Sequence, residues 1–185
     1  MPHSHDHSAT HEAHRHAGPR TVSFAVLTIS DTRTPETDES GKTARGLIEK
    51  AGYTVARLDI VPDEAKRIGA WLLQAAKDRH VEAILTNGGT GISARDTTYE
   101  VIEKKIERPL PGFGELFRAL SHGEIGSAAM LSRAAAGIFK GKPLFAVPGS
   151  PAAVTLALER LILPEISHLI GELRKHGHEH KKHKA

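Results

Sequence analysis

The chain of 185 residues contains no cysteine. Disulfide bonds, zinc sites built on thiolates and a cysteine nucleophile are therefore excluded. Aromatic residues make up only 4% of the chain, which leaves few rings on which the bases of a single-stranded nucleic acid would stack. No apolar run approaches the roughly 20 residues that a bilayer requires, and there is no apolar signal segment. These absences predict a cytoplasmic protein with no membrane partner.

The positive net charge of +3 comes from the C-terminal end of the chain. Among 25 Lys/Arg and 22 Asp/Glu residues, residues 171–185 hold five basic and two acidic ones, and residues 1–20 hold two of each. Eighteen of each sign remain between residues 21 and 170. A neutral globular part has no electrostatic footprint for DNA or RNA, so we expect no nucleic-acid partner.

Histidine is concentrated at both ends of the chain. Residues 1–20 and 175–185 together hold ten of the 13 histidines and almost no large apolar side chains. Because such segments cannot bury a core, we predict a disordered His-rich tail over residues 1–20 and a basic His-rich tail over residues 174–185, which flank one domain over residues 21–173. Closely spaced imidazoles also suit transition metals. A solvated tail is the simpler interpretation, since a tail has no outer groups that fix ligand geometry.

Between the tails, segments with the pattern of buried strands alternate with segments that have the pattern of helices. Short β-branched apolar runs predict strands, and apolar residues repeated every three or four positions predict helices. Strands are expected at residues 22–30, 53–61, 81–86 and 143–147, and helices at residues 40–52, 63–79, 96–107, 113–121, 127–139 and from Pro151 onwards. This alternation predicts a three-layer α/β fold, in which helices flank a mostly parallel, doubly wound sheet.

A glycine-rich segment, TNGGTG, directly follows the predicted strand at residues 81–86. In this segment Gly88, Gly89 and Gly91 surround Thr90. Glycines let backbone N–H groups turn toward an anion and let a phosphate approach without a Cβ in the way. The N-terminus of the following helix adds a favourable dipole. A tight turn between strand and helix would explain only one or two of these glycines, so we interpret the segment as an anion-binding loop.

Polar residues and glycines also follow the other predicted strands. They are Ser30 and Asp31 after the first strand, Asp63 after the second, Asp96 after the glycine-rich segment, and Pro148, Gly149 and Ser150 after the last. Because ligands bind outside the carboxyl ends of parallel strands, these loops are expected to converge on one edge of the sheet. Carboxylates beside a phosphate-binding loop are compatible with polyphosphate when Mg²⁺ bridges the two. For each aspartate, capping of a helix N-terminus is an alternative role.

The chain contains six motifs in a specific order: TISD, VPDE, TNGGTGISARD, PGFGELFR, SRAAAG and VPGSP. Their order and spacing resemble the MoaB/MogA family of molybdenum cofactor biosynthesis proteins, over about residues 22–173. The segment LSHGEIGSAAMLSRAAAG and the long last helix are more similar to the MoaB branch. The resemblance implies a molybdopterin-binding α/β domain that assembles into homotrimers or homohexamers.

The activity that the resemblance implies is that of a molybdopterin adenylyltransferase, which joins molybdopterin to the AMP part of ATP and releases pyrophosphate. Some members of the MoaB branch lack this activity. A non-catalytic molybdopterin-binding or carrier protein of the same pathway is therefore the alternative.

The resemblance also implies roles for individual residues. Asp63 and Asp96 match the acidic pair that active members use with Mg²⁺, and both are present here. The other matched positions are Gly88, Gly89, Thr90 and Gly91 in the loop that holds the nucleotide and pterin phosphates, Ser30 and Asp31 on the nucleotide side, and Pro148, Gly149 and Ser150 beside the loop. Family motifs further include Glu115, Ser132 and Arg133, without an assigned role.

Overall fold

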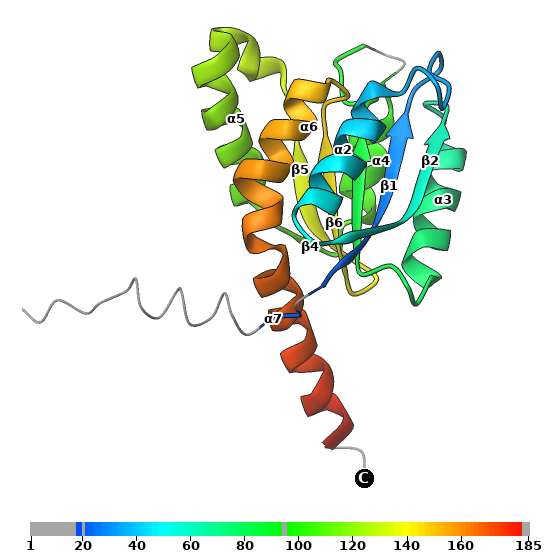
Figure 1. The fold of residues 1–185 in the computed structure, drawn as a ribbon, viewed down its shortest axis with the longest axis vertical. Coiled ribbons are helices and arrows are strands. Elements are labelled where there is room, and N and C mark those ends of the chain that lie inside the picture. The colour runs from blue at the N-terminus through cyan, green and yellow to red at the C-terminus, as the bar shows by residue number, and fades with distance from the viewer. Residues whose placement is uncertain (1–17, 20, 94–95, 183–185) are drawn as a thin grey trace, which may run out of the picture.

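The computed structural model describes residues 18–19, 21–93 and 96–182, which build one six-stranded sheet (Figure 1). The strand order is β2-β1-β3-β6-β5-β4. The strands are β1 (Ser23–Ile29), β2 (Thr54–Val61), β3 (Ala83–Asn87), β4 (Arg108–Pro109), β5 (Ala135–Phe139) and β6 (Lys142–Val147). The pairs β1–β2, β1–β3 and β3–β6 are parallel, whereas β5 is antiparallel to both of its neighbours. The prediction of a mostly parallel sheet flanked by helices is confirmed.

Helices cover both faces of this sheet. The helices are α2 (Glu39–Lys50), α3 (Ala65–Lys77), α4 (Thr98–Lys105), α5 (Pro111–Ile125), α6 (Pro151–Ala157) and α7 (Leu163–Lys182), with a 3₁₀ helix η1 (Gly126–Leu131) and a π-helical segment η2 (Leu158–Ile162). One core cluster joins the sheet to α2, α5, α6 and α7, and a second joins its other face to α3 and α4. The layers are therefore helix, sheet and helix.

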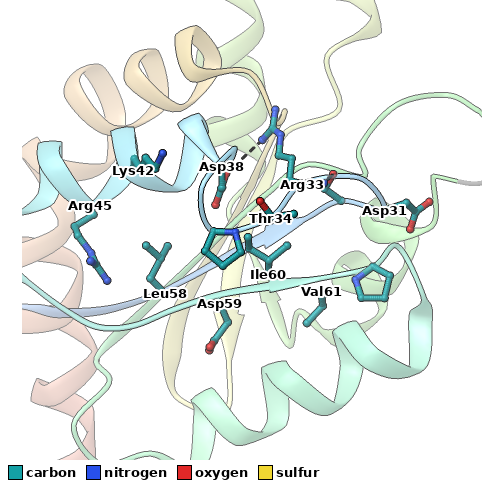
Figure 2. A pocket seen from close by; sticks show the side chains of 13 residues that line it. Asp31, Arg33, Thr34, Asp38, Lys42, Arg45, Leu58, Asp59, Ile60 and Val61 are labelled. Atoms are coloured by element: carbon teal, nitrogen blue, oxygen red, sulfur yellow. Dashed lines mark hydrogen bonds and ion pairs between the residues drawn. The ribbon is translucent and has the colours of Figure 1, made fainter.

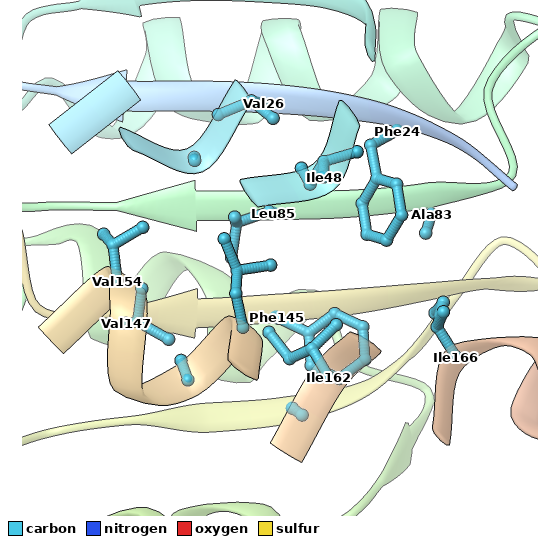
Figure 3. Packing of buried hydrophobic residues seen from close by; sticks show 14 of the residues in the cluster. Phe24, Val26, Ile48, Ala83, Leu85, Phe145, Val147, Val154, Ile162 and Ile166 are labelled. Carbon is cyan, nitrogen blue, oxygen red and sulfur yellow. The ribbon is translucent and has the colours of Figure 1, made fainter. Parts of the chain in front are cut away.

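Strand β1 serves both cores because its successive side chains point to opposite faces of the sheet. Phe24 and Val26 pack in the first cluster, where Figure 3 shows Phe24 facing Ile48 of α2, and Ala25 and Leu27 pack in the second. All of these side chains are fully buried. Burial of one such large apolar side chain stabilises the fold by about 1.5–3 kcal/mol. A central strand that is apolar on both faces thus follows from its place between two helical layers.

The predicted helix at residues 127–139 is wrong beyond its first part. Residues of η1 cover its start, but β5 occupies its end. The alanines of this segment suit a helix, and tertiary packing overrides that propensity. A Cβ at Gly137 would lie 2.6 Å from the carbonyl oxygen of Arg108 and 2.3 Å from Ile106 Cγ2, so the neighbouring segment can approach only a glycine. The small residue Gly137 allows β5 to pair closely with β4, and the periodicity of the sequence gave no sign of this pairing.

A hairpin with a two-residue turn connects β5 to β6. Phe139 pairs with Lys142, and both Lys140 (φ 50°) and Gly141 (φ 77°) between them have positive φ. Positive φ at both central positions is the geometry of the turn whose twist matches that of a β-hairpin. In the sheet, β6 lies beside β3, and β5 lies between β6 and the edge strand β4.

The N-terminal end of the described chain contacts helix α7, the last helix. The Ser167 hydroxyl donates a hydrogen bond to the carbonyl oxygen of Pro19 at 2.9 Å. Helix α7 continues to Lys182, so the segment from residue 174 onwards, predicted as a disordered tail, begins as a helix. The predictions for residues 1–17, 20 and 183–185 lie outside the described residues. Among the described helices, none has the length and apolar character that crossing a bilayer requires.

Candidate functional site

The loops that follow β1, β2, β3 and β6 meet at one edge of the sheet, as expected, because these four strands run in the same direction. Three of these loops enclose a cleft of about 520 Å³, here called the glycine-loop cleft. Of the eleven predicted site residues, eight line this cleft, and a ninth, Asp31, lines a second cleft that adjoins it. The cleft itself is lined by Ser30, Gly88, Gly89, Thr90, Gly91, Pro148, Gly149 and Ser150, together with residues that include Arg33 and Ser132.

The backbone of Gly88 lies in close contact with two neighbouring segments of this cleft. Gly88 has φ +96°, and a Cβ at this position would lie 2.2 Å from the carbonyl oxygen of Ile29. A Cβ at Gly149 would lie 2.9 Å from the Cα of Gly88. The Gly88 N–H donates to the carbonyl oxygen of Val147 at 3.1 Å. The loops after β1, β3 and β6 therefore meet backbone to backbone, which explains why glycines occupy both positions.

The other two glycines of the loop lie against carboxylates. A Cβ at Gly89 (φ +61°) would lie 2.5 Å from Asp63 Oδ2. A Cβ at Gly91 would lie 2.6 Å from Asp96 Oδ2. The structure thus places both predicted acidic residues in contact with the glycine-rich loop. Neither aspartate is among the described residues that line the glycine-loop cleft.

Asp63 caps a helix that is not its own. Its Oδ1 accepts hydrogen bonds from the Thr97 N–H (3.2 Å), the Thr97 hydroxyl (2.9 Å) and the Thr98 hydroxyl (3.3 Å), at the start of α4. Its own N–H donates to Asp31 Oδ1 at 3.0 Å. The carboxylate that follows β2 therefore positions the helix that follows β3. Asp63 is not the N-cap residue of α3, the helix that follows it; that residue is Glu64, and the capping contacts of Asp63 are with α4 instead. Its Oδ2 accepts no hydrogen bond from the described residues.

Asp96 does not occupy the capping position that the sequence predicted. The N-cap residue of α4 is Thr97. Asp96 Oδ2 instead accepts the Ser93 N–H at 3.0 Å, which closes a turn of the loop, and Asp96 borders a separate hollow of about 390 Å³. The helix begins one residue later because Asp63 already supplies the capping oxygen from another loop.

The two carboxylates suit a magnesium ion that also binds a substrate. Asp63 Oδ2 and Asp96 Oδ1 each lack a hydrogen bond to the described residues. Mg²⁺ typically takes one or two carboxylates and completes its shell with phosphate oxygens and water. Within residues 18–19, 21–93 and 96–182, no group of three or more His, Asp or Glu residues is arranged to hold a metal on its own. The donor set fits an ion shared with phosphates.

Arg133 holds the carbonyl side of the glycine-rich loop. Its Nε donates to the carbonyl oxygen of Thr90 at 2.9 Å, and its Nη2 donates to the carbonyl oxygens of Gly91 and, at 3.4 Å, Asp96. Because a trans peptide directs its C=O and N–H oppositely, the N–H groups of Gly91 and Ile92 point away from Arg133. One guanidinium thereby orients several peptides of the loop. The SRAAAG motif marked this arginine, but not its role.

The guanidinium of Arg133 is itself fixed by two neighbours on α4. Its Nη1 forms an ion pair with Glu100 Oε1, and its Cζ lies 4.9 Å from the ring centroid of Tyr99. The hydrogen bond from Arg133 holds the pKa of the Glu100 carboxyl below its ordinary value. Arg133, in the loop after η1, is therefore held between helix α4 and the glycine-rich loop.

We expect Arg133→Met to destabilise the protein by about 1–3 kcal/mol, because the loop carbonyls lose a charged donor. Urea unfolding followed by circular dichroism measures this change. The matched control is Arg118→Met on α5, because Arg118 makes no hydrogen bond or ion pair among the described residues. Equal stability of the two variants would contradict this role of Arg133.

A buried polar network lies beneath the cleft and was not predicted. Asp38 Oδ2 accepts a hydrogen bond from the Thr28 hydroxyl at 2.7 Å, and its Oδ1 accepts the Gly41 N–H at 3.0 Å as the N-cap of α2. The Ser40 hydroxyl lies 3.1 Å from Asp38 Oδ1 and 2.7 Å from Asn87 Oδ1. This network joins β1, α2 and β3 directly below the loops. A signal for Asp38 was present in the sequence, because an aspartate directly before a helical pattern indicates an N-cap.

A second cleft, of about 780 Å³, adjoins the first (Figure 2). Ser30 and Arg33 line both clefts, and the predicted residue Asp31 lines only the second. The second cleft lies between α2, which contributes Lys42 and Arg45, and the edge strand β2. Of the two predicted residues after β1, Ser30 thus lies where the two clefts join and Asp31 lies within the second.

Fold and site together define an α/β protein with a phosphate-compatible ligand edge, at which glycine backbone and two aspartates meet. Residues 25–168 match the family described as "Probable molybdopterin binding domain", and the chain belongs to this family.

Among its relatives, "Molybdenum cofactor biosynthesis protein B" of Halalkalibacterium halodurans is 51% identical over 165 residues, which cover 89% of this chain and 97% of that protein. The protein of the same name from Bacillus subtilis is 46% identical over 165 residues, 89% of this chain and 97% of that protein. The tungsten cofactor synthesizing protein MoaB from Pyrococcus furiosus has a TM-score of 0.76 at 36% identity, covering 84% of this chain and 99% of that one. The MoaB/MogA resemblance is confirmed, and with it a role in molybdenum cofactor biosynthesis.

Proposed function

We propose that the protein adenylates molybdopterin with ATP in a Mg²⁺-dependent reaction, giving adenylyl-molybdopterin and pyrophosphate. The supporting observation is the position of Asp63 and Asp96, each with one carboxylate oxygen that accepts no hydrogen bond from the described residues, against the glycine-rich loop that lines the glycine-loop cleft. These carboxylates would hold Mg²⁺, and the ion supplies charge neutralisation for phosphate oxygens when it is bound.

The reaction requires little covalent chemistry from the protein. An oxygen of the terminal phosphate of molybdopterin attacks the α-phosphorus of ATP and forms a new P–O bond. The bond between the α-phosphorus and the bridging oxygen of the β-phosphate breaks, and pyrophosphate leaves with that oxygen. Because the attacking phosphate oxygen is already ionised, positioning and charge neutralisation are the main tasks. A chain without cysteine meets these requirements with backbone N–H groups, hydroxyls and one arginine around the cleft.

A second candidate function, a molybdopterin carrier without turnover, is favoured by one observation. The Oδ1 of Asp63 accepts three hydrogen bonds from Thr97 and Thr98, which is a structural role that requires no reaction. A carrier would use the same cleft to bind the pterin and would not need the acidic pair for catalysis.

Pyrophosphate release from the purified protein distinguishes the two functions. The assay contains molybdopterin, ATP and Mg²⁺, and reactions without each component serve as controls. Release that requires all three supports adenylation. Absence of release, together with molybdopterin binding in titration calorimetry, would contradict adenylation and establish the carrier.

We also propose that the protein assembles into a homotrimer or homohexamer. The apolar side chains of residues 137–145 and 155–170 lie largely in the core of the monomer, so they are not the surface available for such contacts. Large apolar side chains are exposed elsewhere, with Leu116, Ile125 and Met130 exposed by 56%, 54% and 79%. Light scattering of the full chain measures the mass, and a monomer would contradict the proposal.

A further inference from the structure

Arg33 is the single charged side chain among the described residues that line the glycine-loop cleft. The remaining lining consists of glycine backbone, hydroxyl groups, one proline and apolar side chains. A phosphate in this cleft would therefore find one full positive charge beside the backbone N–H groups. A buried anion without a paired charge is strongly unfavourable, so the position of this arginine matters for ligand charge.

The geometry leaves most donors of Arg33 uncommitted. Its Nη2 donates to the carbonyl oxygen of Gly149 at 2.9 Å, and its Nη1 donates to the Ser40 hydroxyl. Two of the five N–H groups of the guanidinium are used in these contacts with the described residues. The side chain is 29% exposed and lines the cleft. The loop after β1 thus presents a fixed cation with free donors.

The nearest carboxylate offsets only part of this charge. Asp38 Oδ1 lies 3.6 Å from Arg33 Nη1, which is beyond hydrogen-bond distance, although Figure 2 shows the two side chains facing each other. The Asp38 carboxylate is already engaged by Thr28, Ser40 and the Gly41 N–H. The aspartate therefore orients the arginine without consuming its remaining donors.

We propose that Arg33 binds a phosphate group of the substrate that occupies the glycine-loop cleft. This inference rests on the proposed function, since it takes the substrate to be molybdopterin or a nucleotide, both of which carry phosphate. The planar guanidinium contacts two phosphate oxygens at once, while N–H groups of the glycine-rich loop contact others. Its contact with Gly149 couples ligand binding to the loop after β6.

Calorimetric titration of the full chain and its Arg33→Gln variant tests the contact without requiring turnover. The probes are AMP and molybdopterin, each compared with its neutral or dephosphorylated counterpart, adenosine or dephospho-molybdopterin. Arg33→Gln is expected to weaken one phosphorylated probe by about tenfold or more, because a charge-assisted hydrogen bond is lost, and to leave its counterpart unchanged. The probe that weakens shows whether nucleotide or pterin phosphate is the source. Arg118→Gln, which lines neither cleft, should bind both probes like the parent protein.

The same titrations separate a ligand contact from a purely structural tie between loops. An ionic contact weakens as salt is raised, so the affinity of the parent protein for the phosphorylated probe should fall with salt more steeply than that of Arg33→Gln. If Arg33→Gln binds AMP as tightly as the parent protein does, and also binds molybdopterin as tightly, the proposal is overturned. Equal loss for a phosphorylated probe and its counterpart, with the salt dependence unchanged, would also overturn it. Failure of pyrophosphate release alone would overturn adenylation and leave the Arg33 contact standing.

Discussion

Asp63→Asn and Asp96→Asn are each expected to lower the rate of pyrophosphate release by about 100-fold or more, the range that follows loss of one transition-state charge contact. Asparagine keeps a carbonyl oxygen in place of the carboxylate. At position 63 that oxygen can still accept the Thr97 hydrogen bonds, so the cap of α4 is preserved while the negative charge is lost. The variant therefore tests the charge rather than the fold.

Initial rates of pyrophosphate release over a range of Mg²⁺ concentrations measure this effect. If the pair holds the ion, each variant should need more Mg²⁺ and should have a lower maximal rate. The matched control is Asp78→Asn at the C-terminal end of α3, where the carboxylate accepts only the His80 N–H among the described residues. Circular dichroism confirms that all three variants fold. Unchanged kinetics in either Asp63→Asn or Asp96→Asn would remove the proposed mechanism.

Gly88→Ala is expected to lower the free energy of unfolding by about 3–5 kcal/mol, or to prevent folding. Two effects combine at this position. Gly88 has φ +96°, which L side chains rarely adopt, and the new Cβ would lie 2.2 Å from the carbonyl oxygen of Ile29. A backbone atom of the central strand cannot move aside cheaply, so the contact between two loops of the cleft would be lost.

Gly141→Ala separates these two effects. Gly141 has φ +77° in the turn between β5 and β6, and a Cβ there would meet no atom within 4 Å. Its cost should therefore be about 1–2 kcal/mol, from the backbone conformation alone. Urea unfolding of both variants gives the comparison, and Gly149→Ala, with a Cβ 2.9 Å from Gly88 Cα, serves if Gly88→Ala does not fold. A cost for Gly88→Ala no larger than that for Gly141→Ala would contradict the close contact.

The fold was largely predictable because a doubly wound sheet has strong periodic signals. Strands β1, β3 and β6 are mostly apolar and buried, since helices cover both faces of the sheet, whereas the edge strand β2 also carries Arg57 and Asp59. The strand β5 was missed because its small residues have the composition of a helix. Gly137 allows the close approach of β4, and this tertiary contact leaves no local pattern. The end of the helix α7 was missed because composition, rather than periodicity, decided the prediction there.

The position of the candidate site in the fold was predictable from the sequence, whereas most of its side-chain contacts were not. Parallel strands bring their carboxyl ends together, so the convergence of the loops followed from topology. The partners of Arg33 and Arg133 did not, because these contacts join residues 116 and 43 positions apart and have no local pattern. Asp63 shows the same limit, since it caps a helix that starts 35 residues later.

The hairpin between β5 and β6 has a consequence for the order in which the chain folds. Its two-residue turn lets these strands meet early, since hairpins form within about 1–10 μs. The parallel pairs need much longer closures, as between Asn87 and Leu27, which lie 60 positions apart. Gly88 meets Ile29 and Gly149 only after β1, β3 and β6 are all aligned. The cleft is therefore complete only when these three strands are aligned, and the proposed phosphate site does not form before that point.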